Sequence, residues 1–184
     1  MSPYSITPGT LIVAIDIGKN VHWFGCYRYE GCLIEVVAPQ KVRSDLIGFA
    51  AFVATVDHLR ATNQFAAVVL GNEHTGVHHE PWAWQITHHY QAAMQPNVTC
   101  PISYRWLNPL LSNRRQAETS VRQHTNDRTA VAAIAKCLAD GLGHPAHLLI
   151  GTAAHLRELV RSYDQVSRQV RYLSRQVLAQ VDRL

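Results

Sequence analysis

Residues 11–20 read LIVAIDIGKN, and the fold is organised around this stretch. An apolar run that is short and rich in β-branched residues is typical of a strand buried on both faces. The one charge within this strand is Asp16. A lone carboxylate in a buried strand is costly to desolvate unless a cation or hydrogen-bond donors meet it. A bound divalent metal is one solution. The other is an aspartate that ends the strand and caps the turn at Gly18, and the stretch alone leaves both open.

Two further acids occupy comparable positions. Residues 65–70 predict a second short buried strand that leads into Glu73, and ligands of open α/β sheets bind at this carboxyl edge. Asp127 falls in the first turn of a predicted helix, where the helix dipole favours an acid. Converging carboxylates repel each other unless cations join them, and paired magnesium ions catalyse phosphodiester chemistry. We therefore predict that Asp16, Glu73 and Asp127 are catalytic and bind Mg2+ or Mn2+.

The remaining elements before residue 104 follow from local patterns. Strands over 21–29 and 32–38, joined by a turn at Glu30-Gly31, complete a three-stranded antiparallel meander with the first strand. A helix begins at Ser44-Asp45. Its expected apolar face consists of Leu46, Phe49, Ala50, Val53, Val56 and Leu59. A second helix is expected over 80–90 and a weak strand over 97–103.

The next segment is basic. Residues 104–123 contain four arginines among polar residues, and we interpret them as a mobile basic segment. Thr125 or Asn126 then caps a helix that continues to Ala139. The inward side of this helix is predicted to be Val131, Ile134, Ala135 and Leu138.

The C-terminal region predicts a long coiled-coil-like helix. Residues 152–184 contain neither glycine nor proline, and apolar residues recur in two seams. The first seam is Leu156, Tyr163, Val170, Val177 and Leu184, and the second is Leu159, Val166 and Leu173. We expect this helix to pair with a second copy in a homo-oligomer. The domain boundaries that follow are 1–150 for an α/β domain and 151–184 for the helix.

Composition limits the partners. The 184 residues suffice for one domain with a core plus an appendage, and a sequence pI of about 9.0 favours an anionic partner. The arginines of the last helix form either a solvated face or a surface for backbone phosphates. The predicted nucleic-acid-binding residues are Arg105, Arg114, Arg115, Arg122, Arg168, Arg171 and Arg175.

The sequence also indicates a compartment. The four cysteines have no metal-binding spacing and are expected to act as small buried hydrophobes in a reducing environment. The N-terminus has no signal sequence, and no apolar run approaches about 18 residues. We therefore expect a cytoplasmic protein that does not enter the membrane.

Several motifs in order resemble one family. The sequence VAIDIGK at 13–19 resembles the opening of the RuvC-like domain of DEDD transposases of the Piv/MooV, or insertion-sequence 110, family. GNEHTG at 71–76 resembles the family's second motif, in which Glu is followed by x-Thr-Gly. TNDRTAVAAIA at 125–135 resembles its Thr-Asp-x-x-Asp-Ala-x-x-Ile-Ala signature. Asn108-Pro109 and residues 155–161 match further points, so the resemblance spans nearly the whole chain.

The resemblance implies a ribonuclease-H-like (RuvC-like) α/β fold with a mixed sheet flanked by helices. It also implies metal-dependent cleavage and transfer of insertion-sequence DNA. Some members use a bridging RNA, so a guide RNA is a further implied partner. Carried over by position, Asp16, Glu73 and Asp127 are the first three acids, and the fourth falls on Ala130, which cannot bind metal. This alanine is either an engineered replacement or a natural loss.

Other departures qualify the resemblance. Asn126 stands where the family has threonine, and His124 is an alternative partner for Asp127 if the helix begins a turn earlier. The family's second domain, with its nucleophilic serine, has no counterpart before Leu184. The chain also ends inside a heptad, so we expect it to be an incomplete recombinase.

Two other functions remain open at this point. One is a catalytically inactive module that binds nucleic acid and dimerises, which Ala130, the arginines and the heptads favour. The other is an actin-like ATPase, whose first strand also ends in Asp-x-Gly within a meander. That fold needs a second phosphate loop and a second similar domain, for which the chain has little room.

Overall fold

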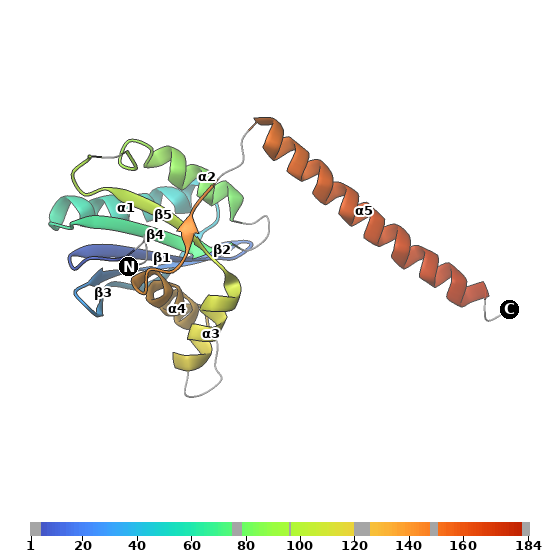
Figure 1. Ribbon diagram of the computed structural model, residues 1–184, viewed down its shortest axis with the longest axis horizontal. Helices are drawn as coiled ribbons and strands as arrows, with labels where there is room; N and C mark the ends of the chain where they lie inside the picture. The colour runs from blue at the N-terminus through green and yellow to red at the C-terminus, as the bar shows by residue number, and fades with distance from the viewer. Residues whose placement is uncertain (1–4, 75–78, 96, 120–125, 148–150, 182–184) are drawn as a thin grey trace. The chain divides into compact units, whose positions relative to one another are not determined.

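The computed structural model describes residues 5–74, 79–95, 97–119, 126–147 and 151–181 (Figure 1). The chain divides into two compact units, Met1–Ala146 and His147–Leu184, which are described separately.

The first unit is built on a mixed sheet. In the described part of the chain the sheet has six strands in the order β3-β2-β1-β4-β5-β6. The strands are β1 (Thr10–Ile17), β2 (Val21–Tyr29), β3 (Leu33–Arg43), β4 (Ala67–Glu73), β5 (Ile102–Leu107) and β6 (His144–Pro145). Strands β1, β4 and β5 run parallel, whereas β2, β3 and β6 pair antiparallel with their neighbours. An antiparallel meander followed by two parallel strands is the ribonuclease-H-like arrangement, so the predicted fold class is confirmed.

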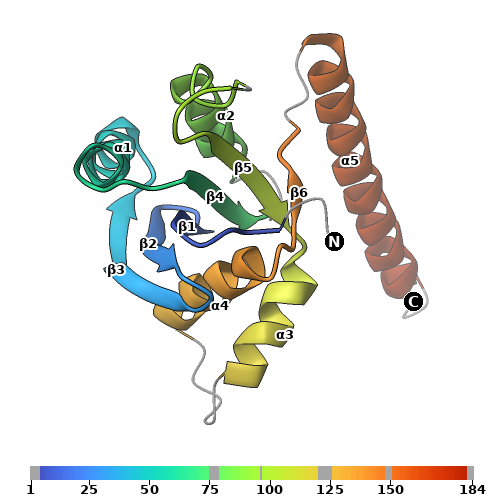
Figure 2. The same ribbon diagram turned by 60° about the vertical axis from the view of Figure 1, so that its left-hand side comes forward.

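Helices cover both faces of this sheet. Helices α1 (Leu46–Thr62) and α2 (Glu80–His89) lie on one face, and α3 (Pro109–Thr119) and α4 (Asp127–Ala139) lie on the other (Figure 2). On the α1 and α2 face, the ring of Trp82 contacts the rings of His22 and Phe52, with centroids 4.3 and 5.3 Å apart. The predicted inward face of α4 is confirmed, and the core residues between this helix and the sheet are Ile12, Ala14, Val69, Leu107, Val131, Ile134, Ala135 and Leu138.

The buried face of α1 differs from the prediction. Its buried residues are Gly48, Phe52, Val56 and Leu59, whereas Leu46 is 74% exposed. A Cβ atom at position 48 would lie 2.0 Å from the carbonyl oxygen of Arg43. The helix therefore packs Gly48 against the end of β3, and this close approach rotates Phe52 rather than Phe49 toward the sheet.

The prediction of a mobile basic segment at residues 104–123 is also wrong for the residues that the structure describes. Residues 102–107 form β5 and residues 109–119 form α3, and residues 120–123 lie outside the described part. Tyr104 and Trp106 are two positions apart, so their side chains lie on the same face of β5, and each is 5% exposed. The β propensity and burial of these aromatics outweigh the polarity of the flanking arginines.

The second unit contains helix α5, which spans Gly151–Val181 and has 31 residues. The described apolar residues of its two predicted seams are 55–73% exposed. No helix in the described residues is both long enough and apolar enough to cross a membrane.

Candidate functional site

Asp16 and Glu73 lie side by side at the carboxyl ends of β1 and β4. The parallel register pairs Ile15 with Asn72, so the next residue on each strand is an acid. Side chains alternate along a strand, which places Asp16 on the same face as Ala14, and Glu73 on the same face as Gly71. A Cβ atom at Gly71 would lie 2.6 Å from Leu138, so this is the face that α4 covers.

Asp127 is the first residue of that same helix. The side chain of Asn126 accepts a hydrogen bond from the Thr129 amide at 2.9 Å, and the Thr129 hydroxyl oxygen accepts one from the Asn126 amide at 3.1 Å. This reciprocal capping box fixes where α4 begins, and therefore fixes the position of Asp127 at its N-terminus. The helix end is a favourable place for a negative charge.

The three acids share one electrostatic environment. Burial, and then the negative charges of Glu73 and Asp127, together raise the pKa of Asp16 to about 6. An ordinary aspartate has a pKa near 3.9. Each carboxylate therefore makes ionisation of Asp16 less favourable, and no described cation offsets this effect enough to restore the usual pKa. A perturbed acid of this kind is a mark of functional sites.

Ser112 orients one of these carboxylates and was missed by the sequence reasoning. It lies in the first turn of α3, is 2% exposed, and its hydroxyl donates a hydrogen bond to Glu73 Oε1 at 2.5 Å. The Asn108-Pro109 pair was a signal for the start of this helix. The pairing with Glu73, 39 positions earlier, could not be recognised from the sequence.

The donor set fits a divalent cation in its chemistry. Mg2+ and Mn2+ prefer carboxylate oxygens, and a cation would relieve the repulsion that raises the Asp16 pKa. Among the described residues, however, no three His, Cys, Asp or Glu side chains are gathered closely enough to hold a metal. Ala130, three residues after Asp127 on α4, is partly buried and supplies no oxygen. The three acids thus create a negative electrostatic field at Asp16, but the described side chains are not gathered into a metal-ligand set.

One aromatic residue and two cations lie near Asp16, in the direction of β2 and β3. The antiparallel register places Trp23 of β2 opposite Asp16, and Lys41 of β3 opposite Trp23. Lys41 Nζ lies 5.2 Å from the centre of the Trp23 ring, and Arg128 Cζ from α4 lies 6.0 Å from it. These three residues were not among the predicted site residues.

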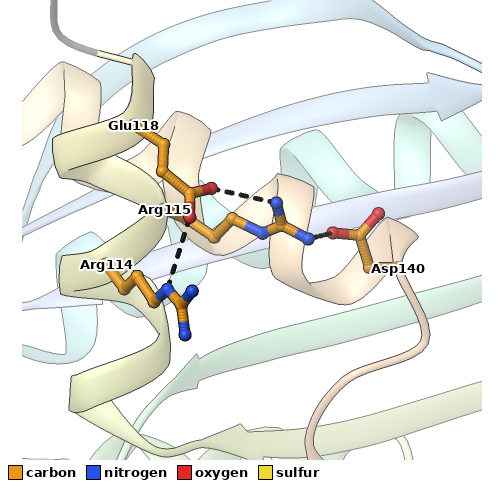
Figure 3. A network of polar contacts seen from close by, with 4 residues as sticks. All are labelled: Arg114, Arg115, Glu118 and Asp140. Carbon is orange, nitrogen blue, oxygen red and sulfur yellow. Dashed lines mark hydrogen bonds and ion pairs between the residues drawn. The ribbon is translucent and has the colours of Figure 1, made fainter.

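The predicted basic residues of the first unit are not brought to the acids as a positive surface. Arg105 is only 7% exposed in β5, so it does not lie in the predicted basic surface segment. Arg114 and Arg115 on α3 both pair with Glu118, and Arg115 also pairs with Asp140 (Figure 3). Two positive and two negative charges leave this network neutral. Arg122 and His124 lie outside the described residues.

The arginines of α5 have a different environment. Arg168, Arg171 and Arg175 surround Tyr172 and line a hollow of about 300 Å3 with it. Tyr172 is 62% exposed, and its hydroxyl oxygen accepts a hydrogen bond from the side-chain amide of Gln176 at 2.8 Å. An exposed aromatic among arginines is compatible with the predicted contact to nucleic acid.

A second hollow lies next to Glu73 at the edge of the sheet. His74 and His144 are exposed, and together with Trp106, Leu107, Asn108 and Pro109 they line a space of about 370 Å3. The rings of His74 and Trp106 are 4.9 Å apart. Both histidines therefore pack near the Trp106 ring.

Comparisons with known proteins reach only the level of the fold. No protein-family model matches the chain, and no curated protein matches it in sequence. Thermus thermophilus RuvC in complex with a Holliday junction substrate is 16% identical, covers 70% of this chain and 91% of its own, and has a TM-score of 0.43. The fowlpox virus Holliday junction resolvase is 13% identical, covers 72% and 99%, and has a TM-score of 0.46. The assignment of the fold rests on the strand order itself.

Proposed function

We propose that this chain is the RuvC-like domain of a DNA transposase or recombinase, which acts on phosphodiesters with a divalent metal at Asp16, Glu73 and Asp127. The observation that carries this proposal is the shared electrostatic environment of the three acids at one sheet edge. The ordered family motifs support it further. A metal held here would activate a water or hydroxyl and stabilise the leaving oxygen of a phosphodiester.

Each acid has its own supporting structure for this role. Asp16 is fixed by a strand whose core residues are fully buried. The Ser112 hydroxyl holds one oxygen of Glu73, which leaves the other oxygen available to a cation. Asp127 gains from the N-terminal end of α4. To share one ion, the three side chains must turn toward a common point, and the attraction of each carboxylate to the cation would outweigh their mutual repulsion.

Ala130 favours a second candidate function. Without a fourth carboxylate, and without a gathered ligand set among the described residues, the domain can serve as an inactive module that binds nucleic acid. Both candidates share the fold and the anionic partner, and they differ in whether metal matters. DNA is the proposed partner in each case, and a guide RNA is proposed from the family resemblance alone.

The long helix supports self-association as part of either function. We propose that α5 pairs with α5 of a second copy, because its seam positions are apolar and exposed. Between residues 151 and 181, the positions that flank the seams contain no lysine, arginine or acid; they are His155, Val160, Ser162, Ser167, Gln169, Ser174, Gln176 and Val181. Arg161, Arg168 and Arg175 recur every seven residues on the opposite side of the helix, so pairing leaves them accessible to nucleic acid.

A titration with Mn2+ by calorimetry tests the proposed metal site. The wild-type chain is expected to bind Mn2+, and Asp16→Asn to abolish this binding. Glu35→Gln is a matched control, because it removes one negative charge from an exposed position on β3 of the same sheet. Equal Mn2+ affinity of the wild type and Asp16→Asn would refute the site.

DNA binding with and without a chelator then separates the two candidates. Tighter binding with Mn2+ supports the metal-dependent domain, whereas equal binding in the presence of a chelator supports the inactive module. Tight binding of ATP in the same calorimeter would instead favour the actin-like alternative, although the described residues form one sheet of this kind rather than two.

A further inference from the structure

Trp23, Lys41 and Arg128 form a compact patch beside the acids, which we call the cation–tryptophan patch. Residues directly opposite each other in antiparallel strands share a face of the sheet. The pairs Asp16 with Trp23 and Trp23 with Lys41 therefore place one acid, one indole and one amine in a row across β1, β2 and β3. Arg128 completes the patch from the first turn of α4.

The charges of the two cations in this patch are not neutralised by an ion pair with another described residue. Lys41 and Arg128 are exposed, and neither has an ion pair with another described residue, although acids lie nearby. Both instead lie over the half-buried ring of Trp23, at 5.2 and 6.0 Å from its centre. A cation over an indole keeps its full charge, whereas a cation paired with a carboxylate is neutralised. Arg114 and Arg115 show the second situation.

This arrangement solves a problem that the acids create. A nucleic-acid strand is a polyanion, and the field of three carboxylates repels it. Positive charge close to Asp16 offsets that repulsion only if it is not already neutralised by ion pairs with the carboxylates. The indole of Trp23 holds the charged groups of Lys41 and Arg128 next to the acids, where both can bind a phosphate.

We infer that the cation–tryptophan patch is a backbone-phosphate subsite for a nucleic-acid strand whose next phosphodiester lies at the acids. Lys41 and Arg128 bind the phosphates, with arginine suited to a two-pronged contact and lysine to a single charged one. Trp23 is a positioning residue that holds both cations. The inference rests on the proposed function for the identity of the substrate, and it adds the residues that hold that substrate.

The salt dependence of binding gives a direct readout of phosphate contacts. For a single strand, the logarithm of affinity falls with the logarithm of salt concentration by about 0.7 for each neutralised phosphate. Removal of one phosphate-binding cation should therefore reduce the slope by about 0.7 for a single strand and by about 0.9 for a duplex. A residue that only supports the fold changes the affinity without this change of slope.

The experiment measures fluorescence anisotropy of labelled single-stranded and duplex oligonucleotides with the full chain in a chelator. Lys41→Gln and Arg128→Gln are each expected to weaken binding about 3- to 10-fold and to reduce the salt slope by about 0.7 for the single strand and about 0.9 for the duplex. Lys136→Gln is the matched control, because Lys136 is an exposed cation in the last turn of α4, at the opposite end of the helix from Arg128. It is expected to bind as the wild type does.

Substitutions of Trp23 test whether its ring positions the two cations. Trp23→Phe keeps an aromatic face and is expected to retain most of the affinity, whereas Trp23→Leu is expected to bind as weakly as the single cation variants. Thermal unfolding of every variant checks that the fold is intact. The inference is overturned if Lys41→Gln and Arg128→Gln match Lys136→Gln in affinity and slope, or if neither oligonucleotide binds the wild type.

This result is independent of the metal site. Lys41→Gln and Arg128→Gln should still bind Mn2+ in calorimetry, because the three acids remain, and Asp16→Asn should still bind oligonucleotide in a chelator. Loss of metal binding alone therefore refutes the proposed chemistry, and loss of the salt-slope effect alone refutes the subsite.

Discussion

Replacement of Asp16 by asparagine should stabilise the folded protein above about pH 6. The native pKa of Asp16 is raised to about 6, so the folded chain holds this proton more tightly than the unfolded chain does. The free energy of unfolding therefore decreases as the pH rises from about 4 to about 6, and the full penalty is present above that range. Asparagine keeps the shape of the side chain and removes the charge.

The size of the effect follows from the pKa. A shift of about 2 units corresponds to a ceiling of about 3 kcal/mol. Asp16 is partly exposed, and solvent screens its interactions with Glu73 and Asp127, so we expect about 1–2 kcal/mol in practice. For a chain of this length, each kcal/mol raises Tm by about 2–4 °C.

Urea and thermal unfolding of the wild type, Asp16→Asn and Glu35→Gln in a chelator provide the assay. Burial lowers the pKa of His22 to about 4, and this group titrates in the same window with the opposite sign. The difference between the wild type and Asp16→Asn cancels the His22 contribution. That difference should be near zero at about pH 4, grow to about 1–2 kcal/mol at about pH 7, and be small at both pH values for Glu35→Gln. A variant no more stable than the wild type at neutral pH would refute the reasoning.

Three further predictions concern the site, its packing and the long helix. Ala130→Asp should tighten Mn2+ binding at least tenfold, or about 1.4 kcal/mol, in calorimetry, because it restores an oxygen one turn after the helix start; no gain would contradict the family alignment at this position. Gly71→Ala should cost about 1–3 kcal/mol in urea unfolding, because its Cβ would lie 2.6 Å from the buried Leu138 side chain, and an unchanged midpoint would mean that the helix packs elsewhere. Val170→Glu should shift the chain from dimer to monomer in sedimentation experiments, whereas an unchanged sedimentation profile would exclude the predicted seam.

Local patterns predicted the parts of the fold where one physical effect dominates. The buried strands leading to Asp16 and Glu73, the meander and the inward face of α4 each follow from hydrophobic periodicity. The rule that ligands bind at the carboxyl edge predicted that the two acids converge, and the parallel pairing of β1 with β4 makes them neighbours.

Elements decided by distant contacts were not predictable in the same way. The buried face of α1 depends on the close approach of Gly48 to Arg43, which no periodicity reveals. The strand at 102–107 was missed because Arg105 made the segment appear polar, whereas the folded chain buries this arginine.

The charges of the site were the hardest part to predict. Sequence composition drew attention to Arg114 and Arg115, which the structure neutralises with Glu118 and Asp140. Lys41 and Arg128 are unremarkable in the sequence, because 86 residues separate them from each other along the chain. Only the strand register and the position of α4 bring both of them to Trp23.

The central claim is that three acids distant in the sequence share one cation at the carboxyl edge of the sheet. Anomalous diffraction from crystals soaked in Mn2+ tests it most directly, since the metal can be located without reference to activity. We expect one Mn2+ peak within coordination distance of Asp16, Glu73 and Asp127 in the wild type, and its loss in Asp16→Asn. Peaks only elsewhere, for example at His74 and His144, or none at all, would contradict it.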